Sequence, residues 1–162
     1  MFRLNKLTDY GVVVLSQICL EDGALCSAQH IARRTGVPLP TVAKVLNILH
    51  RAHLVDSHRG AAGGYTLSRP ASEIKVSDVI EALEGPIALT ACAETAEGHC
   101  EVESLCPMRG SWDKVNRAIR DALARVSLAE MVGSQGAGLF TLAQEAAAAA
   151  GERSAAPAGT AP

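Results

Sequence analysis

Three cysteines lie close together in the second half of the chain, at Cys92, Cys100 and Cys106. The segment that holds them, residues 92–106, is polar and has neither helical nor strand periodicity. A loop of that length without regular structure usually has a functional reason. Thiolates bind zinc and iron well, but structural zinc sites and iron–sulfur clusters usually take four protein ligands. The spacing therefore predicts a metal or cluster site that still lacks a fourth ligand.

The chain as a whole has 162 residues, of which 48% are hydrophobic, and a net charge of −2. This length suits one domain, or a small domain with an extension. No apolar run approaches the roughly 18 residues of a membrane helix, and the first residues lack the features of a signal peptide. We therefore expect a cytoplasmic protein without a membrane partner, in which clustered cysteines bind metal or react more often than they form disulfides.

Charge is divided unevenly along the chain. Residues 1–75 contain nine Lys or Arg and five Asp or Glu, whereas residues 76–162 contain six and twelve. A basic half suggests a polyanionic partner, although chance scatter of surface charge explains such a balance equally well.

Three helices with a glycine turn between the second and third are expected in the basic half. Thr8 is predicted to cap a first helix that continues to about Glu21. Ser27 is predicted to cap a second helix that stops at Gly36, and a third helix follows over about residues 40–51. A short helix, a glycine turn and a longer helix in this order are typical of a helix-turn-helix.

The third helix separates its residues into two faces. Apolar residues recur with helical spacing and form the expected buried stripe: Val42, Val45, Leu46 and Leu49. Lys44 and Asn47 lie on the other side, and with Thr41 they are the candidates for contacts to bases or phosphates. A small solvated helix would look similar, but a Lys/Asn face after this turn is what docking in the major groove of double-stranded DNA requires.

A β-hairpin is predicted directly after this helix, because two short β-prone runs in residues 54–67 flank a tip rich in glycine and alanine. A hairpin in this position is a wing, and Arg59 lies where a wing meets the DNA backbone or minor groove. The alternative is an ordinary hairpin with a solvated arginine. The predicted fold is mainly α with a small β-hairpin wing, a winged helix-turn-helix followed by a long dimerisation helix.

The second half contains two further predicted helices. One covers residues 75–84 and ends at Gly85 and Pro86, and the other begins at about Pro107, after the cysteine loop. Apolar residues of the second helix repeat at intervals of three and four, as in a dimer seam: Trp112, Val115, Ile119, Ala122 and Val126. A seam this short could pack on its own domain, but winged-helix repressors commonly bind paired half-sites as dimers. We therefore expect a homodimer.

The chain is accordingly predicted to have five parts. They are a DNA-binding head (residues 1–75), a linking helix (76–89), a cysteine loop (90–106), a dimerisation helix with a short C-terminal segment (107–132) and a tail rich in Ala, Gly and Pro (133–162), which is expected to be disordered. Ser127 and Glu130 have the spacing of a helix cap within the fourth part. Cys19 is expected to be a small buried residue and Cys26 a free thiol, and neither is assigned a function.

Four short motifs of the chain, taken together, resemble those of a known family. They are Leu-Thr-Asp-Tyr-Gly at residues 7–11, Arg-Gly-x-x-Gly-Gly-Tyr at residues 59–65, Glu-Gly-Pro at residues 84–86 and the three-cysteine loop. Over roughly residues 1–132 the chain resembles the winged-helix regulators that include IscR and NsrR, most of all the subgroup that regulates the SUF iron–sulfur assembly operon. The resemblance implies a homodimeric transcription factor whose cysteine loop holds a 2Fe-2S or 4Fe-4S cluster. We expect a repressor or dual regulator that senses iron–sulfur status and controls SUF-type genes.

The resemblance also bears on the fourth ligand. The IscR branch has a histidine three residues after the third cysteine, where this chain has Arg109, whose guanidinium cannot ligate iron. The NsrR branch uses an aspartate near the N-terminus, supplied by the partner subunit, and Asp9 matches it. We expect Asp9 first, then His99, then Glu101 or Glu103. The alternative for Asp9 is a simple favourable charge at a helix N-terminus.

Other functions remain open at this point. One is a nitric-oxide- or redox-responsive regulator of the same fold, and another is a zinc or thiol sensor without a cluster. An enzyme is not expected, because the sequence has no Ser/His/Asp arrangement and no phosphate-binding glycine loop. The cysteines also lie among carboxylates, which do not activate a thiol. No catalytic residue is therefore assigned.

Overall fold

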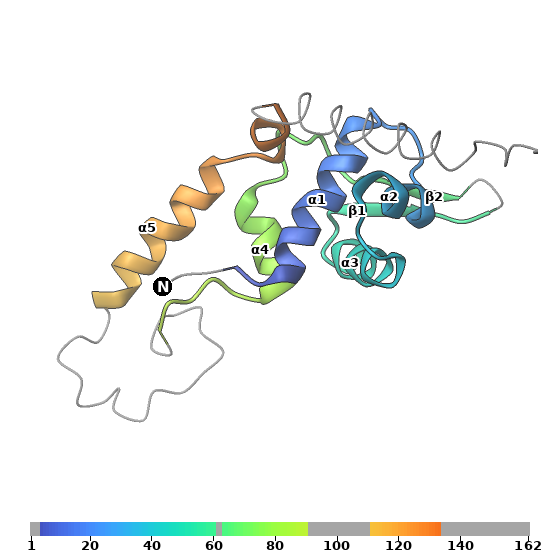
Figure 1. Cartoon of the computed structure of the whole chain (residues 1–162). Coiled ribbons are helices and arrows are strands. Elements are labelled where there is room, and N and C mark those ends of the chain that lie inside the picture. Colours follow the sequence, from blue (N-terminus) through green and yellow to red (C-terminus); the bar gives the residue numbers. More distant parts are fainter. Residues whose placement is uncertain (1–3, 61–62, 91–110, 134–162) are drawn as a thin grey trace, which may run out of the picture.

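The computed structural model describes residues 4–60, 63–90 and 111–133. Its elements follow the order α1 (Lys6–Leu20), α2 (Ala28–Thr35), α3 (Leu39–Arg51), β1 (Val55–His58), β2 (Gly64–Leu67), α4 (Val76–Glu84) and α5 (Ser111–Arg125). Helices α1, α2 and α3 gather with the β1–β2 hairpin, and α4 lies between α1 and α5 (Figure 1). None of the described helices has both the length and the apolar character that crossing a membrane requires.

The helix-turn-helix forms as its caps predict. The hydroxyl of Ser27 accepts a hydrogen bond from the backbone N–H of His30 at 3.1 Å, which starts α2. Gly36 ends α2 with a φ of 71°, a left-handed conformation that glycine adopts without steric cost. Helix α3 then begins at Leu39, one residue before its predicted start. The predicted winged helix-turn-helix fold is confirmed.

The wing is an antiparallel hairpin that is attached to the head along its second strand. Val55 pairs with Leu67 and His58 with Gly64 in the β1–β2 register. On the other side of β2, the backbones of Cys26 and Tyr65 exchange two hydrogen bonds of 3.0 and 2.9 Å. A Cβ atom at Gly64 would lie only 2.9 Å from the Cys26 backbone, so only glycine fits this close approach.

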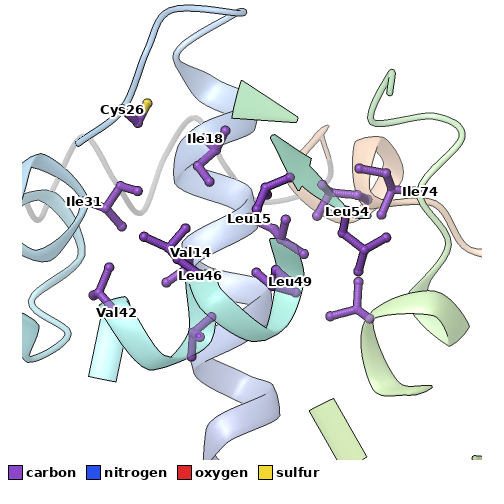
Figure 2. Close-up of a cluster of buried hydrophobic side chains, with 14 of the residues drawn as sticks. Val14, Leu15, Ile18, Cys26, Ile31, Val42, Leu46, Leu49, Leu54 and Ile74 are labelled. Atoms are coloured by element: carbon purple, nitrogen blue, oxygen red, sulfur yellow. The ribbon is translucent and has the colours of Figure 1, made fainter. Parts of the chain in front are cut away.

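The hydrophobic core lies between α1 and α3. Figure 2 shows Val14, Leu15 and Ile18 of α1 beside Val42, Leu46 and Leu49 of α3. All four residues of the predicted α3 stripe are 0% exposed, which confirms the predicted face. Cys26 also belongs to this core, whereas Cys19 is only partly buried, less than predicted.

The chain returns to the head after α5. Lys75 and Ser127 form an antiparallel bridge, and the N–H of Leu128 donates to the carbonyl of Ile74 at 2.8 Å. The predicted cap of the following segment is present, because Ser127 N–H donates to the Glu130 carboxylate at 2.7 Å and Glu130 N–H donates to the Ser127 hydroxyl at 3.2 Å. The C-terminal end of α5 is thus fixed to the head by backbone hydrogen bonds.

The predicted cap of α1 is wrong. The helix begins at Lys6 and its cap is Asn5, whose side-chain oxygen accepts from the N–H groups of Leu7 and Thr8 at 2.8 and 3.0 Å. The hydroxyl of Thr8 instead donates to the Glu84 carboxylate at 2.5 Å, and Asn5 N–H donates to the same oxygen at 2.9 Å. These contacts join the start of α1 to the end of α4.

Glu21 joins the end of α1 to α2. Its carboxylate lies 2.8 Å from Nε2 of His30 and accepts a hydrogen bond from the Gln17 amide at 2.8 Å. The contact with His30 is the main reason that the pKa of Glu21 lies below its usual value. A lowered carboxyl pKa stabilises the fold at pH values above the pKa in the unfolded chain, and this stabilisation is lost as the pH falls through the folded-state pKa.

Glu21→Gln should therefore lower the free energy of unfolding at pH 7, by up to about 1 kcal/mol. The difference from the wild type should shrink as the pH falls below about 4, because the wild-type carboxyl then becomes neutral too. Urea unfolding at a series of pH values measures both effects. Glu73→Gln, at an exposed position, is the control. A difference that stayed constant down to pH 3 would contradict this role of the Glu21 charge.

Candidate nucleic-acid interface

Helix α3 presents one face to solvent while its other face is fully buried. Lys44 and Asn47 are exposed, and Thr41 is half-buried one turn earlier. The first two side chains are thus free to reach a ligand, and the buried stripe behind them fixes the helix. The structure therefore places the three predicted DNA-contact residues of α3 on one accessible surface.

Arg59 directly follows β1 and is exposed, so the wing carries a cation close to its tip. The imidazole Nε2 of the preceding residue, His58, lies 3.2 Å from the hydroxyl of Thr66 across the hairpin. This contact joins the two strands next to Arg59. The cation therefore extends from a hairpin whose two strands are also joined through side chains.

A groove of about 440 Å³ lies between the wing and the start of α2. Ser27, Ala28 and Gln29 line it on the helix side, and His58 and Arg59 are among the wing residues that line the other side. The first N–H groups of a helix have no partner within the helix, and its N-terminus carries partial positive charge. Together with the Arg59 guanidinium, this environment suits a phosphate group.

This groove cannot be identified from local sequence signals, because it depends on residues about thirty positions apart. In the sequence Gln29 is one polar residue in the first turn of the second predicted helix, with nothing nearby to mark it as part of a groove. A signal was nevertheless present, since the helix before a recognition helix commonly crosses the DNA backbone and Ser27 marks where that helix starts.

The predicted metal ligands are placed only in part. Cys92, Cys100, Cys106 and His99 lie outside the described residues, as do the alternatives Glu101 and Glu103. Asp9 is exposed in the first turn of α1. Within residues 4–60, 63–90 and 111–133, no three His, Cys, Asp or Glu side chains are grouped so as to hold a metal ion. Asp9 is therefore an exposed carboxylate that belongs to no such group within the described residues.

The two cysteines of the head are poor candidates for a reactive site. Burial is the main cause that raises the pKa of the Cys19 thiol and that of the Cys26 thiol. A raised pKa lowers the fraction of thiolate, which is the nucleophilic and metal-binding form. Cys26 is also 1% exposed and packed in the core.

An apolar stripe runs along α5 and onto Val126, the residue directly after it, and the described part of the chain leaves this stripe largely uncovered. Trp112, Val115 and Val126 are 40%, 44% and 40% exposed, Ala122 is exposed and Ile119 is half-buried. These are the five residues of the predicted dimer seam. Large exposed apolar residues that lie in one row commonly mark a protein–protein contact.

The chain is similar to known proteins over most of its length. The family model described as "Rrf2: Iron-dependent Transcriptional regulator" matches residues 4–134. Protein aau3 of Rhizobium meliloti (strain 1021) is 34% identical over 130 residues, which cover 80% of this chain and 84% of that protein.

Solved structures of two regulators are similar over most of their length. CymR, the global cysteine regulator of B. subtilis, has a TM-score of 0.64 and 25% identity, covering 83% of this chain and 99% of that one. IscR of T. potens has a TM-score of 0.59 and 29% identity, covering 85% and 92%. The similarity thus covers the head, α4 and α5 together.

Proposed function

Because the chain belongs to the Rrf2 family of transcriptional regulators, we propose that it is a homodimeric repressor that senses iron–sulfur cluster status and controls SUF-type assembly genes. Rrf2 proteins are DNA-binding regulators and not enzymes, which confirms the expectation that this chain is not an enzyme. The observation that carries the DNA-binding part of the proposal is the exposed Lys44/Asn47 face of α3, which rests on a fully buried stripe.

In the proposed complex α3 enters the major groove. Lys44 can donate to the N7 and O6 acceptors of guanine, and Asn47 can bond adenine through both its donor and its acceptor. Thr41 is placed to reach a phosphate, and Arg59 to reach the backbone or a narrow minor groove. The groove between the wing and α2 would receive a phosphate of the DNA backbone, because it joins a helix N-terminus to a cation.

The apolar stripe on α5 supports a homodimer. Covering Trp112, Val115 and Val126 with the same stripe of a second chain would remove apolar surface from water, which favours association. A dimer of winged helices binds two half-sites about one helical turn, or roughly 34 Å, apart. Operator affinity would then depend on how α5 is oriented relative to α3.

Cys92, Cys100 and Cys106 would hold the cluster, with the partner subunit's Asp9 as fourth ligand and His99 as the alternative. When bound, a cluster supplies a labile iron centre that responds to iron supply and oxidants. The family description and the three clustered thiols support this assignment. Asp9 fits a ligand donated to another subunit, since its carboxylate is exposed at the start of α1. The residue before Asp9, Thr8, donates a hydrogen bond to Glu84 of α4, and this contact joins the start of α1 to the end of α4.

The test is to purify the full chain without oxygen and to measure iron, acid-labile sulfide and visible absorbance. Cys100→Ser should lose iron and sulfide, whereas Cys19→Ser, the same change in the head, should keep both. Operator affinity of the holo and apo proteins is then compared at one stated salt concentration.

Colourless protein with stoichiometric zinc would contradict the cluster and favour the zinc or thiol sensor. Equal operator affinities of the holo and apo forms would contradict the proposal that the cluster controls DNA binding. Asp9→Ala with unchanged iron content would remove Asp9 as the fourth ligand.

A further inference from the structure

Asn116 is unusual among the residues of α5. Of the 15 residues of this helix, all of them described, only Asn116 is buried, with 4% of its surface exposed. Its amide Nδ2 donates to the carbonyl of Ile87 at 2.9 Å, and its Oδ1 accepts from the N–H of Leu89 at 3.2 Å. The side chain thus bonds the backbone on both sides of residue 88, in the segment that leaves α4.

We propose that Asn116 is a positioning residue that sets the rotation of α5 about its own axis, and thereby the direction of the dimer stripe. The proposal rests on the proposed function, because the stripe matters only if two chains associate on DNA. It adds a residue that touches neither DNA nor the partner chain but decides how the two heads are spaced.

The geometry of the helix connects Asn116 to the stripe. At about 100° per residue, the five stripe residues centre roughly 80° around the helix from Asn116. Asn116 therefore lies at the flank of the stripe, on the side that faces the rest of the chain. A rotation of α5 about its own axis would turn the stripe by the same angle.

A side-chain contact between α5 and α4 itself fixes the rotation less well. Arg120 of α5 reaches Oε1 of Glu81 with Nε at 3.2 Å and with Nη2 at 3.1 Å, but the Arg120 side chain is 42% exposed. Exposed ion pairs between long side chains contribute little and adapt to small displacements. The short Asn116 amide makes two directional hydrogen bonds to backbone atoms, which tolerate much less displacement.

A buried amide also specifies one arrangement over others. If α5 rotated, both hydrogen bonds of the buried Asn116 amide would break, and breaking the one to the carbonyl of buried Ile87 is especially costly. An apolar residue at position 116 would pack almost equally well over a range of angles. Single buried asparagines fix the register of coiled coils for the same reason.

The rotation of α5 would be transmitted to the recognition helix through α4. The segment held by Asn116 follows α4 closely, and Glu84 at the end of α4 accepts hydrogen bonds from Asn5 and Thr8 at the start of α1. Helix α1 in turn packs on α3 across the core. The angle of the stripe and the position of α3 are therefore linked by contacts that the structure describes.

The test compares Asn116→Leu, which keeps the size of the side chain but replaces its amide with an apolar group, with the wild type and with Lys114→Ala, an exposed control on the same helix. Hydrogen exchange of the Leu89 amide reports the Asn116 contact directly and should be at least about tenfold faster in Asn116→Leu. Sedimentation reports whether the variant is still a dimer.

The decisive measurement uses two DNA duplexes, the selected operator and the same operator with one base pair inserted between its half-sites. The wild type and Lys114→Ala should strongly prefer the natural spacing. Asn116→Leu should remain a dimer, but its affinity for the operator with natural spacing should fall roughly tenfold. It should also lose most of its preference for that duplex over the one with the inserted base pair.

An unchanged preference, with both affinities lowered together, would show a merely structural role and would overturn the proposal. A wild-type chain that neither dimerises nor binds DNA would overturn the proposed function as well, so the two failures are distinct. If Asn116→Leu does not fold, Asn116→Ser, which keeps a short donor and acceptor, should show the same loss of preference in weaker form.

Discussion

Lys44→Glu is expected to reduce operator affinity by roughly 100-fold or more while leaving the free energy of unfolding unchanged. Loss of one cationic contact to DNA typically costs about 1–3 kcal/mol, and the new carboxylate adds repulsion from phosphates and base acceptors. The fold should tolerate the change, because Lys44 is exposed and the stripe that holds α3 lies on its other face. Fluorescence anisotropy with labelled operator measures the affinity.

Lys114→Glu provides the matched control for this charge reversal. It changes the net charge by the same amount, but from an exposed position on α5, away from the α3 face. Titrations at several salt concentrations should show a smaller salt dependence for Lys44→Glu, by about one to two counterions, and little change for the control. Equal affinities of the two variants would contradict α3 as the recognition helix.

Val115→Asp is expected to convert the dimer to a monomer and thereby to abolish tight operator binding. Val115 is 44% exposed, so the monomer loses little packing when it is replaced. Across a closed dimer seam, however, an unpaired carboxylate would be buried, at a cost of several kcal/mol. The dimer dissociation constant should rise by roughly 100-fold or more.

Ala124→Asp is the control, because this exposed residue lies about 160° around α5 from the centre of the stripe. It introduces the same carboxylate and should leave the dimer intact. Sedimentation velocity over a range of concentrations measures association, and thermal unfolding checks the monomer. A Val115→Asp protein that sedimented as a dimer would show that the stripe is covered in some other way.

Local signals predicted most of the head correctly. Ser27 and Gly36 act through neighbouring backbone groups, so their sequence positions were enough to place both ends of α2. The stripe that includes Val45 and Leu49 depends only on helical periodicity, and all of it is buried. Features that depend on a few adjacent residues can thus be predicted without knowledge of the rest of the chain.

Features that depend on distant partners were missed. Thr8 is a good capping residue, but its hydroxyl donates a hydrogen bond to Glu84, 76 positions away. Asn5 caps the helix instead. Asn116 looked like any polar residue of an exposed helix, because nothing nearby in sequence indicates a bond to Ile87. In both cases a backbone or carboxylate group from another element decides the role of the side chain.

In the candidate interface too, the local features were predicted and those that depend on distant residues were missed. The exposure of Lys44 and Asn47 follows from the period of one helix and was predicted. The groove that Gln29 and Arg59 line arises only when β2 pairs with the backbone of Cys26, which brings the wing next to α2. That pairing brings together residues about forty positions apart.

The hydrogen bonds of Asn116 have an evolutionary consequence. The chain is fixed to α5 at residues 87 and 89, and the residues directly after α5 are fixed to the head at Ile74 and Lys75. Both anchors lie outside residues 91–110, so they do not depend on which residues occupy that segment. We therefore expect the composition and length of residues 91–110 to vary among related chains more freely than the residues that hold α5 in place.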